Sequence, residues 1–295
     1  MSQLSLFDRD RVLREEIRHA LTVLDFPQAE GKTRSYDSIP GAAPLAWERK
    51  VLRFGQRIQK RRLDLDAGFE LWERFESSSF FPSVPAAYAN AIRISFFSRL
   101  LAFNRGLFED TRTGQDRSLG DFCLRAEQPR NARRLYEREL REYGDSWRLR
   151  LQLGNCNLLT GDGQAARANY RQAFLLGLPA EHNPQIADAP LRRGLAGADD
   201  PDWAFPQAFV EGRFPSPRFT AREEFEAFLR VFLDPRAGKP DPAVGEPRLF
   251  SVHWVISENR HFCDETTLLT SRRAMKALHP RLHAVYMRNL EARRG

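Results

Sequence analysis

Cysteine is scarce in this 295-residue chain, and the three that occur, Cys123, Cys156 and Cys263, lie far apart. An odd number of widely spaced cysteines does not make a disulfide framework, which favours a reducing compartment. Long apolar runs are missing too. The longest, ISFFSRLLAF, is interrupted by Arg99 and is too short to cross a bilayer. The first residues also lack the pattern of a secretory signal. We therefore expect a cytoplasmic protein without membrane contact.

Catalytic signatures are absent as well. The sequence holds no GxSxG, no phosphate-binding loop, no GxGxxG, no HExxH and no paired CxxC. We therefore expect no enzymatic activity, no catalytic residue and no cofactor. Six side chains that could bind a metal gather near the C-terminus: His253, His261, Cys263, Asp264, His279 and His283. Pro280 separates His279 from a regular helical spacing with His283, so we expect surface or capping roles and no metal site. A hydrolase or metal-dependent enzyme with its site in 248–295 is the least favoured alternative.

Lysine is rare among the basic residues. Only five of the 46 are lysine, and the formal net charge is +7. A basic protein attracts polyanions without specificity. So strong a preference for arginine is typical of a GC-rich, bacterial genome, so the charge alone does not favour nucleic-acid binding.

Helical periodicity dominates what is present. Apolar residues recur at helical spacing from residue 7 onward, and we find no pair of alternating strands. The fold prediction is therefore all-α, and only residues 248–257 remain open between strand and helix. Composition and helical periodicity divide the chain into an N-terminal helical region (1–112), a repeat region (113–180), a proline-rich acidic connector (181–219) and a C-terminal helical region (220–295). We expect the connector to be mostly extended.

Two segments of the repeat region match at a fixed offset of 34 residues. Ser118–Gly144 and Gln152–Leu178 share Leu119 with Leu153, Gly120 with Gly154, Ala132 with Ala166, and Tyr136 with Tyr170. The pattern resembles the tetratricopeptide repeat, a 34-residue helical hairpin. The second copy is the stronger, because the first has Glu127 where the pattern places a turn glycine. The resemblance implies a short hairpin array, or α-solenoid, with helical flanks that do not match the repeat.

Small residues at this spacing have a packing reason. Two antiparallel helices approach closely only where glycine or alanine leaves room, so we expect Gly154 to meet Ala166 across the crossing. Tyr170 would then fill the gap against the next repeat. Gly161 and Gly163 suit the tight turn between the helices. One repeat cannot bury its apolar face alone, so the flanking helices must cap the array.

The resemblance implies a non-enzymatic scaffold that binds a protein or peptide in a concave groove. By the family pattern the groove-facing positions are Arg117, Asp121 and Leu124 in the first copy, and Arg148, Leu151, Asn155 and Leu158 in the second. Asn155 occupies a position where some members use asparagine to hold a peptide. The accompanying lysine is Leu151 here, which disfavours a carboxylate clamp. Each position also fits an ordinary solvated helix face.

A charge contrast suggests an internal ligand for that groove. Four arginines and one acid lie between Trp147 and Gly177, whereas six acids and two arginines lie between Pro179 and Gly212. A segment stiffened by proline loses little entropy on docking. We therefore hypothesise that residues 181–212 fold back onto the basic groove.

The N-terminus carries one more motif. The pentapeptide QLSLF resembles the sequence by which many bacterial replication and repair proteins dock on the sliding clamp, with Gln3, Leu4, Leu6 and Phe7 as the contacting residues. The alternative function is therefore an accessory factor in DNA replication or repair. Leu6 and Phe7 also make an apolar lead-in to the helix that follows, and we favour this interpretation because short motifs often match by chance.

Overall fold

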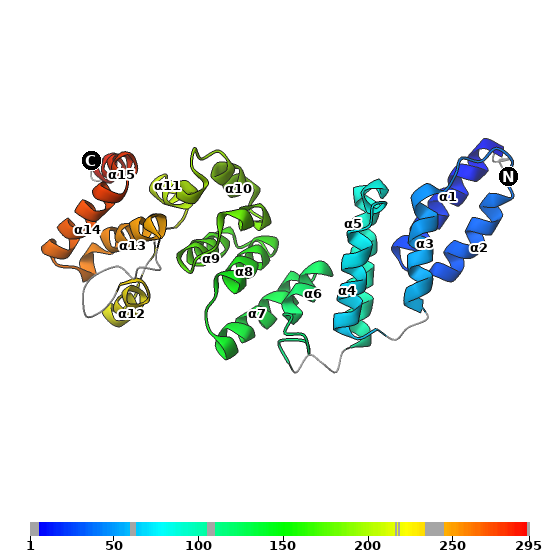
Figure 1. Ribbon diagram of the computed structural model, residues 1–295, viewed down its shortest axis with the longest axis horizontal. Helices are drawn as coiled ribbons and strands as arrows, with labels where there is room; N and C mark the ends of the chain where they lie inside the picture. The colour runs from blue at the N-terminus through cyan, green and yellow to red at the C-terminus, as the bar shows by residue number, and fades with distance from the viewer. Residues whose placement is uncertain are drawn as a thin grey trace. The chain divides into compact units, whose positions relative to one another are not determined.

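A computed structural model describes residues 6–59, 63–104, 110–215, 217, 219–233 and 245–293. The chain forms two compact units, Met1–Leu135 and Tyr136–Gly295 (Figure 1). Over the described ranges the regular structure is helical and includes no strand, and an isolated β-bridge joins Arg112 and Ser118. The all-α prediction is confirmed. Within the described part of the chain, no helix combines the length and apolarity that a bilayer crossing needs.

The first unit is built from helical pairs around an aromatic core. Its helices are α1 (Leu6–Thr22), α2 (Phe26–Asp37), α3 (Ala46–Gln59), α4 (Leu65–Glu76), α5 (Ala86–Phe103), α6 (Leu119–Arg125) and the start of α7 (Pro129–Tyr143). The Phe54 ring of α3 stacks on Phe75 of α4 with 3.9 Å between centroids. Trp72 is fully buried and packs against Phe96 and Phe97 of α5. The large rings supply apolar area that short helices could not otherwise bury.

The second unit begins within α7 and contains a tightly packed hairpin. Its further helices are α8 (Trp147–Leu159), α9 (Gly163–Leu175), α10 (Ala189–Ala196), α11 (Ala204–Val210), α12 (Arg222–Phe232), α13 (Glu246–Glu258), α14 (Glu265–Leu278) and α15 (Pro280–Ala292). Helices α8 and α9 pack together as the hairpin. Phe174 of α9 stacks on Phe205 of α11, and Phe209 stacks on Trp254 of α13. The segment 248–257, left open by sequence, is helical as part of α13.

The 34-residue offset recurs in the backbone hydrogen bonds of two interhelical turns. After α6 the donors Ala126, Glu127 and Gln128 bond the carbonyls of Phe122, Leu124 and Cys123 at 3.0, 3.0 and 2.8 Å. After α8 the donors Thr160, Gly161 and Asp162 bond Cys156, Leu158 and Asn157 at the same three distances. Glu127 and Gly161 both have positive φ, of 53° and 92°. The two segments therefore share one turn geometry, which closes the C-terminus of the first helix.

The close approach in the second hairpin joins Gly154 to Tyr170 rather than to Ala166. A Cβ placed on Gly154 would lie 2.4 Å from a ring carbon of Tyr170, and its three nearest neighbours all belong to that ring. Tyr170 and Ala166 are both fully buried, one helical turn apart on α9. The expected pairing with Ala166 is thus corrected, because the larger side chain reaches the glycine first.

A third related segment, which the 34-residue comparison missed, ends α11. At an offset of 35 residues the donors Leu176, Gly177 and Leu178 correspond to Glu211, Gly212 and Arg213, and each set bonds the equivalent carbonyls of its own helix. Gly177 and Gly212 have φ of 97° and 73°. The sequence Gln-Ala-Phe occurs at 172–174 and again at 207–209. The two helix ends are therefore equivalent in backbone and in sequence.

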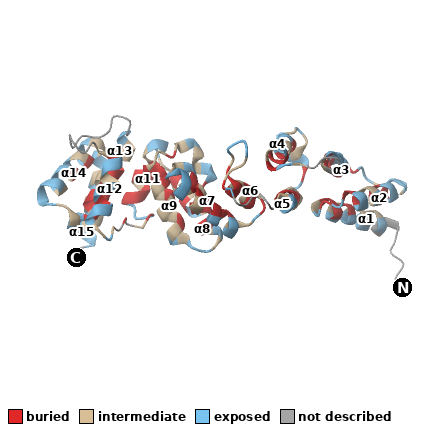
Figure 2. Ribbon diagram, turned by 90° about the horizontal axis from the view of Figure 1, so that it is seen from below, coloured by how far each residue is buried: buried red, intermediate tan, exposed pale blue. Residues whose placement is uncertain are grey.

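The proline-rich connector is not mostly extended, contrary to expectation. Residues 181–219 include most of a 3₁₀ segment (Ala180–Gln185), α10, a second 3₁₀ segment (Pro201–Trp203) and α11. Six of the seven residues of α11 are buried, which Figure 2 shows as an almost continuous red helix. Pro190 and Pro201 occupy first-turn positions, where the missing amide donor costs nothing. The number of prolines therefore led to a wrong prediction of extended structure, because a proline in the first turn of a helix does not interrupt it.

Candidate peptide-binding site on helix α8

Helix α8 is covered on more than one side, which its sequence explains. Ser146 caps its first turn, where the side-chain oxygen accepts from the Leu149 amide at 3.3 Å. Leucines then alternate with polar residues, and the buried positions run from Leu149 to Asn157 with two interruptions, at Arg150 and Gln152. Buried residues at nearly consecutive positions point in different directions from a helix, so they require packing partners on more than one side. Helix α9 is one partner, and the returning chain after Leu178 is another.

Asn155 connects α8 to that returning chain. Its Nδ2 donates to the carbonyl oxygen of Gln185 at 3.1 Å, and its Oδ1 accepts from the backbone amide of Ala187 at 2.9 Å. The two backbone groups flank Ile186, whose side chain is fully buried. One amide side chain thus holds a donor and an acceptor of a single peptide segment. Such contacts read the backbone and not the side chains, as in recognition of an extended peptide.

Tyr170 fixes the orientation of the Asn155 amide. Its hydroxyl donates to Asn155 Oδ1 at 2.9 Å, and both side chains are buried. Burial raises the pKa of Tyr170, and the negative charge of Asp188 raises it further. The phenol therefore remains protonated and keeps its donor. With the hydroxyl and the Ala187 amide both pointing at Oδ1, the Nδ2 group is left to face the Gln185 carbonyl.

The end of the segment is held by charge and ring contacts. Asp188 Oδ2 lies 3.1 Å from Nε of Arg167 on α9, and Oδ1 accepts from the Leu191 amide at the start of α10. The Asp188 side chain is only 5% exposed. The ring of His182 lies over Trp147 of α8, with centroids 4.8 Å apart. An acid of the connector therefore does pair with an arginine of the second repeat copy.

Nearby, Arg171 of α9 is also committed to the returning chain. Its guanidinium donates to the carbonyl oxygen of Pro215. Burial lowers the pKa of Arg171 to about 10, so the side chain is charged at neutral pH. Of the basic residues that motivated the internal-ligand hypothesis, Arg167 and Arg171 contact residues beyond Leu178, whereas Arg150 pairs with Asp145 at 2.7 Å.

The groove positions expected in the second copy are placed unequally. Leu151 is fully buried and belongs to the core, so it offers no surface to a partner. Asn155 is buried under the Gln185–Ala187 backbone. Leu158 is half-buried against the same core, and Arg148 is exposed. An open groove at these positions is therefore absent from this part of the described chain, since residues 180–188 occupy its centre.

The groove positions of the first copy lie in the other unit. The Arg117 guanidinium stands over the Phe69 ring at 4.4 Å and is 3.6 Å from an oxygen of Asp66. Asp121 and Leu124 are half-buried on α6. The three expected groove positions of the first copy therefore lie in unit 1 and the four of the second copy lie in unit 2, although the first copy itself continues past Leu135 into unit 2.

Three of the five residues of the clamp-docking motif fall outside the described residues. Gln3 and Leu4 lie before the first described residue, and Leu6 and Phe7 are the first two residues of α1. The described part of α1 therefore includes the last two residues of the pentapeptide. Docking on a sliding clamp stays a prediction.

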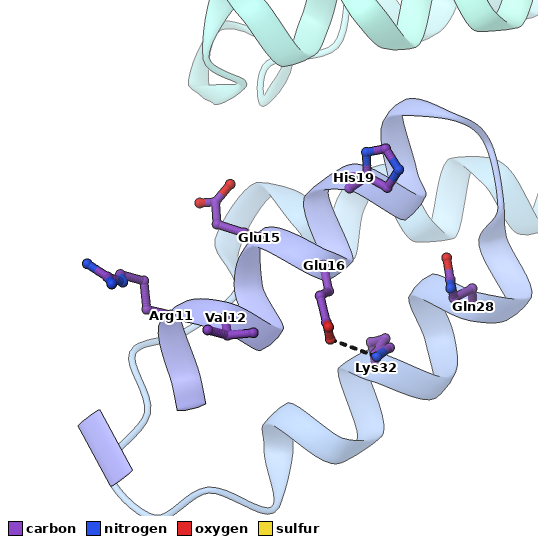
Figure 3. Close-up of a pocket in the computed structure, with 7 residues that line it drawn as sticks. All are labelled: Arg11, Val12, Glu15, Glu16, His19, Gln28 and Lys32. Carbon is purple, nitrogen blue, oxygen red and sulfur yellow. Dashed lines mark hydrogen bonds and ion pairs between the residues drawn. The ribbon is translucent and has the colours of Figure 1, made fainter. Parts of the chain in front are cut away.

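Two other features of the described chain do not form a site. No group of three or more histidine, cysteine or acidic side chains is placed to hold a metal among the described residues. A surface hollow between α1 and α2 is lined by Arg11, Val12, Glu15, Glu16, His19, Gln28 and Lys32. Its acid Glu16 and base Lys32 point toward one another and form an ion pair at 2.7 Å (Figure 3). Because its lining mixes acids and bases, the hollow does not concentrate ligands of one charge sign.

Sequence reasoning selected Asn155 as a groove position and hypothesised that residues 181–212 fold back onto the groove, but it did not identify residues 185–187 as the contact. The signal for the occupant was the apolar Ile186 amid polar neighbours, which marks a buried anchor within a connector. The site is thus a helix face, a tyrosine-oriented asparagine and a short segment of the same chain seated upon it. Comparison with protein-family models, with curated proteins and with solved structures finds no match for this chain.

Proposed function

We propose that the protein is a non-enzymatic scaffold of the tetratricopeptide type, which binds an extended segment of a protein partner against α8. The observation that supports this is the pair of hydrogen bonds from Asn155 to the backbone of residues 185 and 187. A side chain that satisfies both a carbonyl and an amide of one segment can hold any peptide of similar backbone conformation. In the protein without a partner, residues 180–188 would occupy this binding position on α8.

An occupant in the same chain sets the condition for partner binding. A tethered segment competes at an effective concentration that is in the millimolar range for short linkers. A partner peptide must therefore bind α8 more favourably than the tethered segment does, or bind only after that segment has been displaced. This makes the scaffold selective for partners that supply further contacts, and it predicts weak binding of isolated peptides to the intact chain.

The test uses the chain's own segment as the probe. Residues 181–187 are replaced by seven alternating glycines and serines, and a fluorescent peptide of residues 178–190 is titrated onto the variant. We expect the peptide to bind this variant at least tenfold more tightly than it binds the intact chain. Asn155→Ala in the same variant should weaken binding by about tenfold or more, because each lost hydrogen bond contributes about 1 kcal/mol. Asn169→Ala is the control, since that asparagine contacts Ala165 and Arg150 instead.

A second variant guards against loss of folding. Ala187→Pro removes only the amide that donates to Asn155, and Ile186 already has the extended conformation (φ −66°, ψ 120°) that precedes proline well. This variant should bind the free peptide better than the intact chain does. Equal binding to all forms, or no effect of Asn155→Ala, would remove the support for a peptide site on α8. A pull-down from extract of the source organism, comparing the glycine–serine variant with its Asn155→Ala form, then identifies the partner.

A further inference from the structure

A cationic hollow lies in the first unit, between α3, α4 and the turn that follows α4. It is lined by Lys50, Arg53, Phe54, Arg57, Leu71, Arg74, Phe75, Ser78, Ser79 and Phe80. Four of these ten residues are cations and none is an acid. The hollow differs in this respect from the one between α1 and α2, where acids and bases are mixed. A concave surface of one charge sign concentrates counter-charged ligands.

The cations of α3 share one face and lack acidic partners. Lys50, Arg53 and Arg57 are spaced three and four residues apart, so they line one side of the helix, and all three are exposed. No ion pair joins them to an acid of the described chain, whereas Arg74 is shared with Glu70 at 3.1 Å. Arg53 and Arg57 are separated by about 6 Å along the helix axis, on the scale of one nucleotide step.

Aromatic and hydroxyl groups complete the lining. Phe80 is half-exposed, stands edge-on to Phe75 at 5.5 Å, and has the Lys50 ammonium 5.2 Å from its centroid. The exposed Ser79 side chain makes no hydrogen bond to the described residues. A ring beside unpaired cations is the combination that holds a base by stacking and its phosphates by charge.

We infer that this hollow binds the phosphodiester backbone of a single-stranded nucleic acid, with Arg53 and Arg57 on successive phosphates and Phe80 against a base. An acidic peptide is the competing ligand. Seven of the ten lining residues lie within α3 and α4, whose backbone groups are already bonded, so an extended peptide finds little backbone to pair with. Charge and stacking, which nucleic acids supply, are what the hollow offers.

The experiment measures binding of a fluorescent 20-mer of deoxythymidine to the full chain by anisotropy, as a function of salt. Four cations that neutralise phosphates give a log–log salt slope of about −3, so binding should weaken about 50-fold between 50 and 200 mM salt. For Arg53→Gln/Arg57→Gln the slope should fall to about −1.5, which is a loss of about 7-fold over the same range. A 20-mer of uridine distinguishes RNA from DNA as the source of the strand.

The matched control is Arg130→Gln/Arg134→Gln. Arg130 and Arg134 are exposed on α7 and have the same four-residue spacing as Arg53 and Arg57. Their substitution therefore removes the same net charge at a different place on the chain. An unchanged salt slope for the control, with thermal melting of both variants like that of the parent, supports the site. Equal losses in the two variants would show attraction by net charge alone and would overturn the inference. Absence of binding by the parent chain, or competition by polyglutamate as effective as that by unlabelled strand, would overturn it as well.

Discussion

The α6–α7 and α8–α9 turns have the same hydrogen bonds at equivalent positions, but different residues produce them. Gly161 takes the left-handed conformation in the second turn, where glycine has no steric cost, and Glu127 takes it in the first. The geometry therefore survives a residue that disfavours it. The backbone hydrogen bonds of the turn form with glutamate at this position as well, and glycine lowers the steric cost of the conformation.

The same pair of hairpins differs at the residue that would recognise a peptide. Position 155 is asparagine, and its equivalent 34 residues earlier is Asp121. An ionised carboxylate accepts hydrogen bonds but cannot donate one to a peptide carbonyl, whereas the amide does both. Only the second copy is therefore suited to hold a backbone at two points. The turn is common to the two copies, and the proposed binding chemistry belongs to one of them.

The largest effect is expected where the second hairpin is packed most tightly. Gly154→Ala places a Cβ 2.4 Å from the ring of Tyr170, which is fully buried and has no room to move. We expect unit 2 to lose about 2–3 kcal/mol of stability, as overpacking of a core does. Hydrogen exchange of the α8 and α9 amides measures the loss. Gly163→Ala is the control, because nothing lies within 4 Å of its added Cβ, and equal effects at the two glycines would contradict the packing argument.

Exchanging the polar residues at 155 and 121 tests the difference between the hairpins. Asn155→Asp removes the donor to Gln185 and buries a carboxylate, at a cost of about 2 kcal/mol at pH 7, whereas Asp121→Asn should change stability by less than about 0.5 kcal/mol. Burial raises the pKa of the new carboxyl above its unfolded value. The variant's deficit relative to the parent should therefore be small near pH 4 and grow as pH rises. A deficit independent of pH would show that the carboxylate is not buried.

A smaller effect is expected at the turn glycine itself. Gly161 has φ of 92° and no heavy atom within 4 Å of an added Cβ, so Gly161→Ala introduces backbone strain without a clash. We expect a loss of about 1 kcal/mol, read from the shift in the thermal midpoint of unit 2. A loss as large as that of Gly154→Ala would mean that the turn, and not the helix crossing, limits the hairpin.

What the sequence predicted, and what it did not, follows from the range of each interaction. The helices, the turn at Gly161 and the need for a small residue at 154 depend on local spacing, and all are visible in the chain. The partner of Gly154 was misassigned because spacing cannot say which of two neighbouring side chains, Ala166 or Tyr170, fills the gap. The third related segment was missed because its offset is 35 residues, and only 34 was compared.

The candidate site was less predictable than the fold. The family pattern placed Asn155 in the expected groove, but it could not show that Leu151 is buried or that residues 185–187 cover the asparagine. Whether Asn155 is covered depends on the path of the chain after Leu178. The sequence did not predict that path, because the proline-rich segment was interpreted as mostly extended. The cationic hollow was equally hidden, since Arg53 and Arg74 become neighbours only when α3 and α4 pack.

The smallest effect should come from repairing the first turn. Glu127 has φ of 53°, which costs a non-glycine residue about 1 kcal/mol, and its side chain accepts from Asn90 at 3.0 Å and lies 3.6 Å from Arg93. These contacts are exposed and contribute little. Glu127→Gly should therefore stabilise unit 1 by about 0.5 kcal/mol, and Glu127→Gln, which keeps the strain and the hydrogen bond, should leave it nearly unchanged. Thermal melting of the two variants side by side measures this. If Glu127→Gly destabilised the unit, the Asn90 and Arg93 contacts would outweigh the backbone strain, and the first copy would depend on its glutamate as the second depends on its glycine.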